Sequence, residues 1–201
     1  GAASKLQYGD FTLRSGMDYN TILKTLSVQQ VKRKTITITF PEGYTAVAIA
    51  QKMEENGLCS VDDFLACANG EDGSDFSQYD FWNAIPDTEG RLMKCEGYLF
   101  PDTYEFYKNH NAKNALGKLI DAFADRIDED AFASSKAKSM GYSMKDVVII
   151  ASLIEKETDG TDQRDIASVI YNRLQKPGET AGLLQIDAAL LYGLPRNLPR
   201  R

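Results

Sequence analysis

Apolar residues recur every three or four positions over several stretches of the chain, which is the spacing of a buried helix face. This spacing predicts helices over residues 18–26, 45–56, 114–127 and 162–174, with a further short helix after Ser60. The threonine that opens the second range and Ser60 are both good N-caps. The chain is therefore predicted to be rich in helix.

Two shorter stretches alternate between apolar and polar residues, as does a strand with one buried face. They are residues 8–13 and 35–40. Placed on either side of helix 18–26, they predict a small β-α-β unit over residues 5–40. Its size and order are similar to LysM-like modules that hold glycan strands. A packing subdomain without a ligand is the alternative interpretation.

One mostly apolar run, residues 147–154, leads directly into a Glu-Lys-Glu sequence. Ser143 precedes it as a predicted N-cap, with Asp146 three residues later. A segment that is apolar on all sides predicts a helix enclosed by protein. An acid at the end of such a helix would lose water, which suits a general acid. The alternative is that Glu155 and Glu157 mark the point where the helix reaches solvent.

Residues 96–106 place aromatic residues among small and acidic ones on both sides of a proline. Pro101 excludes a central strand through that point and favours a rigid extended turn. Aromatic faces and fixed carboxylates suit a carbohydrate, so this segment can line a groove. The alternative is that Tyr98, Phe100 and Tyr104 cover the core. Trp82 likewise could stack on a sugar ring or anchor the core.

Charge and the length of the apolar runs argue against nucleic-acid binding and against a membrane-spanning helix within these residues. The 201 residues carry 23 basic and 29 acidic side chains, a formal net charge of −6, without a dense basic cluster. Nucleic acid is therefore not an expected partner. The longest mostly apolar run has eight residues, against the roughly 20 that a membrane-spanning helix needs. We expect a native anchor, if there is one, to lie upstream.

Cysteine and histidine usage indicates that any acid-base chemistry should use carboxylates. The three cysteines lack a C-x-x-C spacing, which argues against a zinc site and a disulfide framework, so we expect free thiols. The single histidine, His110, lies in a polar turn, which disfavours a Ser-His-Asp or Cys-His catalytic centre. No lysine has a convincing pyridoxal setting. We expect neither a metal nor a cofactor.

Four parts of the sequence together resemble the endolytic murein transglycosylases, the YceG-like family. They are Pro-Glu-Gly-Tyr-Thr at 41–45, Glu-Gly-Tyr-Leu-Phe-Pro-Asp-Thr-Tyr at 96–104, Ala-Ser-Leu-Ile-Glu-Lys-Glu-Thr at 151–158, and the segments 164–174 and 184–187. The family usually has proline and threonine where this chain has Ala188 and Ala189. The resemblance predicts an α+β fold: a LysM-like subdomain (5–40), a helical connecting segment (41–90), and a mainly helical catalytic domain with short strands (91–201). That last domain is expected to be incomplete at its C-terminus.

The resemblance implies a lytic transglycosylase that acts on peptidoglycan. Glu155 would be the general acid and base that cleaves the β-1,4 bond between N-acetylmuramic acid and N-acetylglucosamine, leaving a 1,6-anhydro-muramyl end. Glu157 is two residues away on the helix and faces another side, so we expect a hydrogen-bonding or structural role for it. The predicted substrate-binding residues, which supply carboxylate, amide or aromatic groups, are Glu96, Tyr98, Asp102, Tyr104, Glu157, Asn172, Gln185 and Asp187.

The implied partners are peptidoglycan glycan strands and proteins of cell-wall synthesis. The implied location is the extracytoplasmic face of the bacterial cell membrane, with a single-pass N-terminal anchor upstream of these residues. The rival hypothesis is a non-catalytic peptidoglycan-binding or scaffold protein of the cell-wall synthesis machinery.

Overall fold

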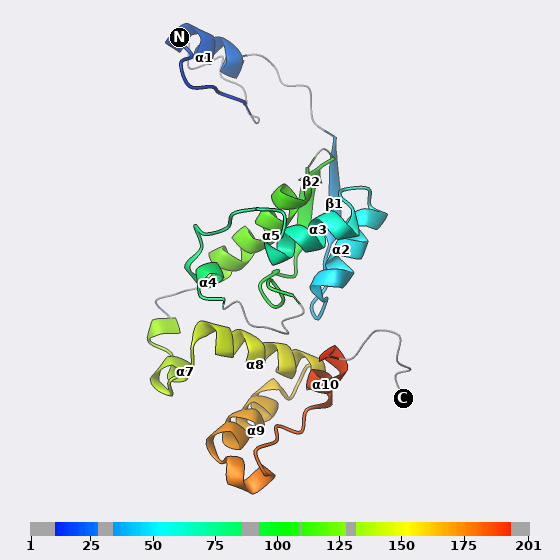
Figure 1. The fold of residues 1–201 in the computed structure, drawn as a ribbon, viewed down its shortest axis with the longest axis vertical. Coiled ribbons are helices and arrows are strands. Elements are labelled where there is room, and N and C mark those ends of the chain that lie inside the picture. Colours follow the sequence, from blue (N-terminus) through cyan, green and yellow to red (C-terminus); the bar gives the residue numbers. More distant parts are fainter. Residues whose placement is uncertain (1–10, 28–33, 86–92, 109, 128–131, 194–201) are drawn as a thin grey trace.

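The computed structural model describes residues 11–27, 34–85, 93–108, 110–127 and 132–193 of the chain. Within them, the structure consists of helices of different lengths and one small sheet (Figure 1). The elements are α1 (Tyr19–Ser27), β1 (Thr35–Thr39), α2 (Ala46–Glu55), α3 (Val61–Asn69), α4 (Asp80–Asn83), β2 (Thr103–Tyr107), α5 (Ala112–Arg126), α7 (Lys136–Ser139), α8 (Met144–Glu157), α9 (Gln163–Gln175), η2 (Pro177–Thr180) and α10 (Asp187–Gly193). The predicted α+β class is confirmed.

The sheet consists of β1 and β2, which run antiparallel with Ile38 opposite Tyr104. Alternation puts Ile38, Tyr104 and Phe106 on the buried face of this sheet. The partner of β1 is thus a strand after the Pro101 turn. Of the strand expected over 8–13, residues 8–10 lie outside the described part of the chain and 11–13 form no strand. The predicted LysM-like β-α-β unit is therefore not confirmed.

Helix α1 forms where the pattern predicted it, with the Asp18 carboxylate accepting hydrogen bonds from the amides of Asn20 and Thr21. Its apolar side chains were expected to face inward. In the structure Ile22, Leu23 and Leu26 are partly buried, whereas Tyr19 is 73% exposed. The expectation was therefore wrong for Tyr19.

The first hydrophobic cluster contains residues of the sheet and of helices α2, α3 and α5, which lie next to one another in Figure 1. Its largest fully buried side chains are those of Phe40, Phe64, Phe106, Ile38, Ile49, Met53, Leu116, Leu119 and Ile120. Each buried side chain of this size contributes about 1.5–3 kcal/mol to folding. Trp82 belongs to this cluster: it is 6% exposed and its ring lies 5.1 Å from that of Phe76. The core-anchor interpretation of Trp82 is the one that the structure supports.

Three helices begin at the predicted side-chain caps. The hydroxyl of Thr45 accepts from the amide of Ala48 at 3.2 Å, and that of Ser60 from Asp63 at 3.1 Å. Ser143 starts α8 with a capping box: its hydroxyl accepts from the Asp146 amide, and the Asp146 carboxylate accepts from the Ser143 amide. These caps fix where α2, α3 and α8 begin.

A second, smaller cluster joins α8, α9 and the segment before α10 through Ile150, Ile170 and Ile186. The prediction that α8 is enclosed by protein was wrong. Ile150 is its one buried residue, and Ile149 is 45% exposed. Apolar composition gave the helix correctly, but only the residues that face α9 and the first cluster are covered.

Residues 183–186 form an irregular segment without strand pairing, and α10 follows from Asp187. The sequence pattern did not predict α10. Among the described residues, no helix is both long and apolar enough to cross a membrane.

Candidate active site

The end of α8 meets the turn that precedes α2, at the junction between the two hydrophobic clusters. The ammonium group of Lys156 donates to the carbonyl oxygen of Gly43 at 2.6 Å, across 113 positions of sequence. Oε1 of Glu155 lies 3.3 Å from the point that a Cβ atom on Gly43 would occupy. Glu155 is exposed. An exposed glutamate thus places its carboxyl group beside the backbone of the turn before α2.

Glu96 is at the same junction. Its two carboxylate oxygens lie 3.1 and 3.2 Å from the amide nitrogen of Ala46, which donates to them at the start of α2. That amide belongs to the first turn of the helix, where backbone donors lack partners within the helix. The hydroxyl of Tyr192 in α10 donates to Oε2 of Glu96 at 3.2 Å. Glu96 therefore links α2 to α10.

The residue after Glu96 allows the segment to approach α8 closely. Gly97 has a φ of +88°, and a Cβ atom there would lie 2.7 Å from Cγ1 of Val148. Real Cβ atoms do not come so close to a neighbour, so this position requires glycine for both backbone and space. Val148 in turn packs against the first cluster.

Glu157 and the segment before α10 form the other side of the helix end. Oε1 of Glu157 accepts from the amide of Ala188 at 3.4 Å. Arg173 of α9 donates to the carbonyl oxygens of Leu184 and Gln185, the latter at 3.4 Å. These contacts hold the segment 184–188 against α8 and α9.

The polar side chains predicted for this region differ in how they are presented. Asn172, Gln185 and Asp187 are exposed, and Asp187 is the first residue of α10. Gln185 has a φ of +53°, an uncommon conformation for a residue with a side chain. The structure thus brings Glu155, Glu157 and the segment that carries Gln185 and Asp187 to one end of α8.

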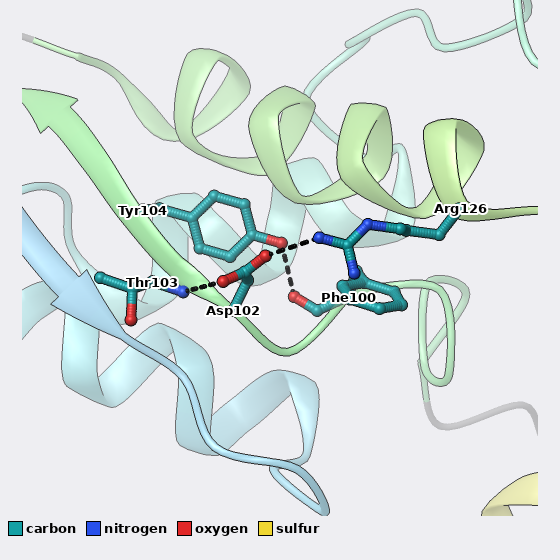
Figure 2. A network of polar contacts seen from close by, with 5 residues as sticks. All are labelled: Phe100, Asp102, Thr103, Tyr104 and Arg126. Carbon is teal, nitrogen blue, oxygen red and sulfur yellow. Dashed lines mark hydrogen bonds and ion pairs between the residues drawn. The ribbon is translucent and has the colours of Figure 1, made fainter.

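Asp102 and Tyr104 belong to a separate polar network on β2 and α5 (Figure 2). Asp102 accepts from Arg126 at 3.0 Å and from the amide of Thr103 at 2.7 Å. The hydroxyl of Tyr104 donates to the carbonyl oxygen of Phe100 at 2.6 Å, and burial raises the pKa of Tyr104 to about 12. The Arg126 guanidinium lies 4.6 Å from the ring centre of Phe100. This network includes no residue of α8, α9 or α10.

Tyr98 lies in the first cluster rather than on an open surface. It is 4% exposed, its ring stacks on that of Phe81 at 5.5 Å, and Phe123 meets it edge-on at 5.2 Å. Tyr104 is 9% exposed. In this conformation both rings contribute to the core.

Thiol and metal chemistry have little support in the described residues. All three cysteines are free, and burial raises the pKa of Cys59 to about 11 and also raises that of Cys95. Such thiols are protonated near neutral pH and are poor nucleophiles. Within the described ranges, no group of three or more histidine, cysteine or acidic residues is placed to hold a metal ion.

The sequence profile of the YceG-like family matches residues 1–200, nearly the whole chain. The chain belongs to the YceG-like family. Two named relatives of this YceG-like chain are called endolytic murein transglycosylase. The one from Bacillus subtilis is 30% identical over 203 residues, covering 98% of this chain and 54% of the relative. The one from Streptococcus pneumoniae R6 is 28% identical over 201 residues, covering 93% of this chain and 35% of the relative. The chain thus spans between a third and about half of their length.

A crystal structure of a YceG-like protein from Listeria monocytogenes has the same fold. The TM-score is 0.67 at 23% identity, and the match covers 98% of this chain and 64% of that one. The similarity therefore extends over both clusters of this YceG-like chain.

Several residues that build the junction were not predicted from the sequence. Gly43 and Gly97 lie in the segments that carry the family resemblance, and a glycine in a short turn is a signal for positive φ. Lys156 lies between two predicted site residues, yet its contact with Gly43 depends on tertiary structure. The sequence around Tyr192 contains no comparable signal.

Proposed function

We propose that this YceG-like chain carries a lytic transglycosylase, as the names of its relatives suggest. The proposed substrate bond is the β-1,4 link between N-acetylmuramic acid and N-acetylglucosamine inside peptidoglycan strands. The proposed product is a 1,6-anhydro-muramyl end, with Glu155 as general acid and then general base.

The observation that carries this proposal is the position of Glu155. Glu155 is an exposed residue near the end of α8, and its carboxyl group lies next to Gly43, at the junction between two parts of the chain. Carbohydrate sites need a carboxyl group that a chain-like substrate can reach. A glycan bound at this junction would exclude water from the carboxyl group, which strengthens its interaction with the glycosidic oxygen.

The proposed reaction needs one carboxyl group and no water. Protonated Glu155 gives its proton to the glycosidic oxygen as the bond from that oxygen to C1 of the muramyl residue breaks. The muramyl C6 hydroxyl oxygen then bonds to C1, and its proton passes to the Glu155 carboxylate. The acid is regenerated, and the second carboxylate of ordinary glycosidases is less necessary because the nucleophile is intramolecular.

The other predicted residues have supporting roles in the proposal. Glu157 holds α10 through the Ala188 amide. Gln185 and Asp187 are exposed in the segment that Glu157 contacts, and Asn172 is exposed on α9; all three are proposed to bind N-acetyl and hydroxyl groups. The burial of Tyr98 and Tyr104 favours a structural role for their rings.

The proposed activity also implies a place and partners. Murein is extracytoplasmic, so the protein would act at the outer face of the cytoplasmic membrane, close to cell-wall synthesis proteins. A membrane anchor and a LysM-like module remain predictions from the resemblance.

Digestion of purified glycan strands tests the proposal. Mass spectrometry should detect anhydro-muramyl ends with the parent chain and a loss of at least about 100-fold with Glu155→Gln. Glu55→Gln is the matched control, because Glu55 is an exposed glutamate in the last turn of α2. If Glu155→Gln forms as many anhydro ends as Glu55→Gln, Glu155 is not the acid. If the parent binds strands without cleaving them, the non-catalytic binding role takes its place.

A further inference from the structure

The turn between β1 and α2, two elements of the first cluster, lies next to Glu155. Residues 41–44 connect β1 to α2, and Gly43 is the point where this turn meets the end of α8. A Cβ atom on Gly43 would lie 3.3 Å from Oε1 of Glu155 and 3.4 Å from the nitrogen of Lys156. One backbone position is therefore packed against both side chains.

Two separate features favour glycine at position 43: its backbone conformation and its close neighbours. Its φ of +72° favours glycine, as does that of Gly57 at +69°. The surroundings differ, since a Cβ atom on Gly57 would meet nothing within 4 Å. A methyl group at position 43 would add a contact with the Glu155 carboxyl that a methyl group at position 57 cannot add. Alanine substitutions at the two positions thus separate the effect of backbone strain from the effect of displacing the Glu155 carboxyl group.

Lys156 fixes the distance between the turn and the helix. Its ammonium group donates to the Gly43 carbonyl oxygen at 2.6 Å, a charge-assisted hydrogen bond between units far apart in sequence. Because Lys156 directly follows Glu155 on α8, a change in the length of this hydrogen bond would move the Glu155 carboxyl group relative to the turn. The last residues of a helix fray readily, and this hydrogen bond holds the end of α8 against the turn before α2.

We infer that Gly43 and Lys156 are positioning residues that set the orientation of the Glu155 carboxyl group toward the scissile bond. This inference rests on the proposed function of Glu155. General acid catalysis requires the proton donor within hydrogen-bond reach of its acceptor, and a misplacement of about 1 Å can lower the rate by roughly 100-fold. Removing the clasp, the hydrogen bond from Lys156 to Gly43, therefore affects turnover more than binding.

Four variants of the 201-residue chain test the inference: Lys156→Met, Lys156→Arg, Gly43→Ala and Gly57→Ala. We expect Lys156→Met and Gly43→Ala to lower kcat by roughly tenfold to 100-fold with little change in KM. Lys156→Arg, which can still donate to the carbonyl oxygen, should recover most of the loss. Gly57→Ala bears the same kind of backbone strain and should keep the parent kcat.

A second measurement does not depend on turnover. The carboxyl ¹³C resonance of Glu155, assigned with Glu155→Gln, reports on the surroundings of that group. It should shift in Lys156→Met and Gly43→Ala and stay at its parent position in Gly57→Ala. Thermal melting of each variant checks that the chain is folded.

The results separate this inference from the proposed function. If Glu155→Gln abolishes cleavage but Lys156→Met and Gly43→Ala match Gly57→Ala in both kcat and the ¹³C resonance, the positioning role is wrong and the acid role stands. If Glu155→Gln cleaves like the parent, the acid role itself fails. Equal losses of kcat in Lys156→Met and Lys156→Arg would also contradict a role for the Lys156–Gly43 hydrogen bond.

Discussion

Glu96 and Tyr192 are joined by a hydrogen bond from the tyrosine hydroxyl to Oε2 of the glutamate at 3.2 Å. The same carboxylate accepts from the amide of Ala46 at the start of α2. One acidic side chain therefore connects a helix of the first cluster to α10, which packs against α8. The Glu96 side chain and the Lys156–Gly43 hydrogen bond together link the two parts of the chain around Glu155.

Replacing Glu96 with alanine should destabilise the fold. Ala46 is fully buried, so its amide would lose its acceptor in a place that water does not easily reach. An unsatisfied buried donor costs about 1–3 kcal/mol. Urea unfolding should show a loss of that size for Glu96→Ala. Tyr192→Phe, which removes only the hydroxyl bond of a 45% exposed side chain, should cost less. Equal losses would contradict the capping role of Glu96.

Gly97→Ala should destabilise the contact between the Glu96 segment and α8. The new methyl group would lie 2.7 Å from Val148, and overpacking typically costs about 1–3 kcal/mol. Gly141→Ala is the matched control, since Gly141 has the same φ of +88° and nothing within 4 Å of its Cβ position. Adding Val148→Ala to Gly97→Ala should recover part of the loss. A loss no greater than that of Gly141→Ala would contradict the close packing.

The capping box of α8 predicts a pH dependence of stability. Hydrogen bonds from the Ser143 hydroxyl and then from its amide lower the pKa of Asp146 from its ordinary value of 3.8. A carboxyl group with a lowered pKa in the folded state stabilises the fold above pH 3.8. That contribution is lost as the pH falls through the folded pKa.

Ser143→Ala should therefore cost about 1 kcal/mol near neutral pH and lose less stability than the parent on acidification. Urea unfolding near pH 7 and near pH 3 measures both quantities. Ser135→Ala is the control, because Ser135 caps α7 through the amide of Lys138, with no acid at that position. The explanation fails if Ser143→Ala and the parent lose the same stability on acidification.

Local signals in the sequence predicted the helices and their caps well. Thr45, Ser60 and Ser143 begin helices as expected, because a cap needs only a side chain and an amide two or three residues later. The β1 strand was also found from its alternation. These features depend on neighbours in sequence, so one sequence suffices for them.

Tertiary partners could not be predicted in the same way. The alternation in β1 does not say that its partner is β2 rather than a strand near residue 10. Likewise, the apolar composition of α8 does not say which of its faces is covered, and Ile149 remains exposed. The Lys156 contact with Gly43 joins residues 113 positions apart, so only the folded chain reveals it.

For the predicted site, too, the sequence selected residues without determining their tertiary surroundings. Glu155 was selected from its place at the end of an apolar run and from the family resemblance, and the structure places it at the junction. The burial that was expected to surround it is absent, since Glu155 is exposed. Tyr98 was selected for its aromatic ring, but ring stacking with Phe81 places it in the core.

Cleavage in water enriched in ¹⁸O tests the central claim most directly. A lytic transglycosylase closes the anhydro ring with the substrate's own hydroxyl, so its new muramyl ends should contain no ¹⁸O, and Glu155→Gln should form none of them. New reducing ends that carry ¹⁸O would identify a hydrolase, and unlabelled anhydro ends formed equally by Glu155→Gln would show that another group is the acid. Either result would contradict the proposed role of Glu155 in a lytic transglycosylase.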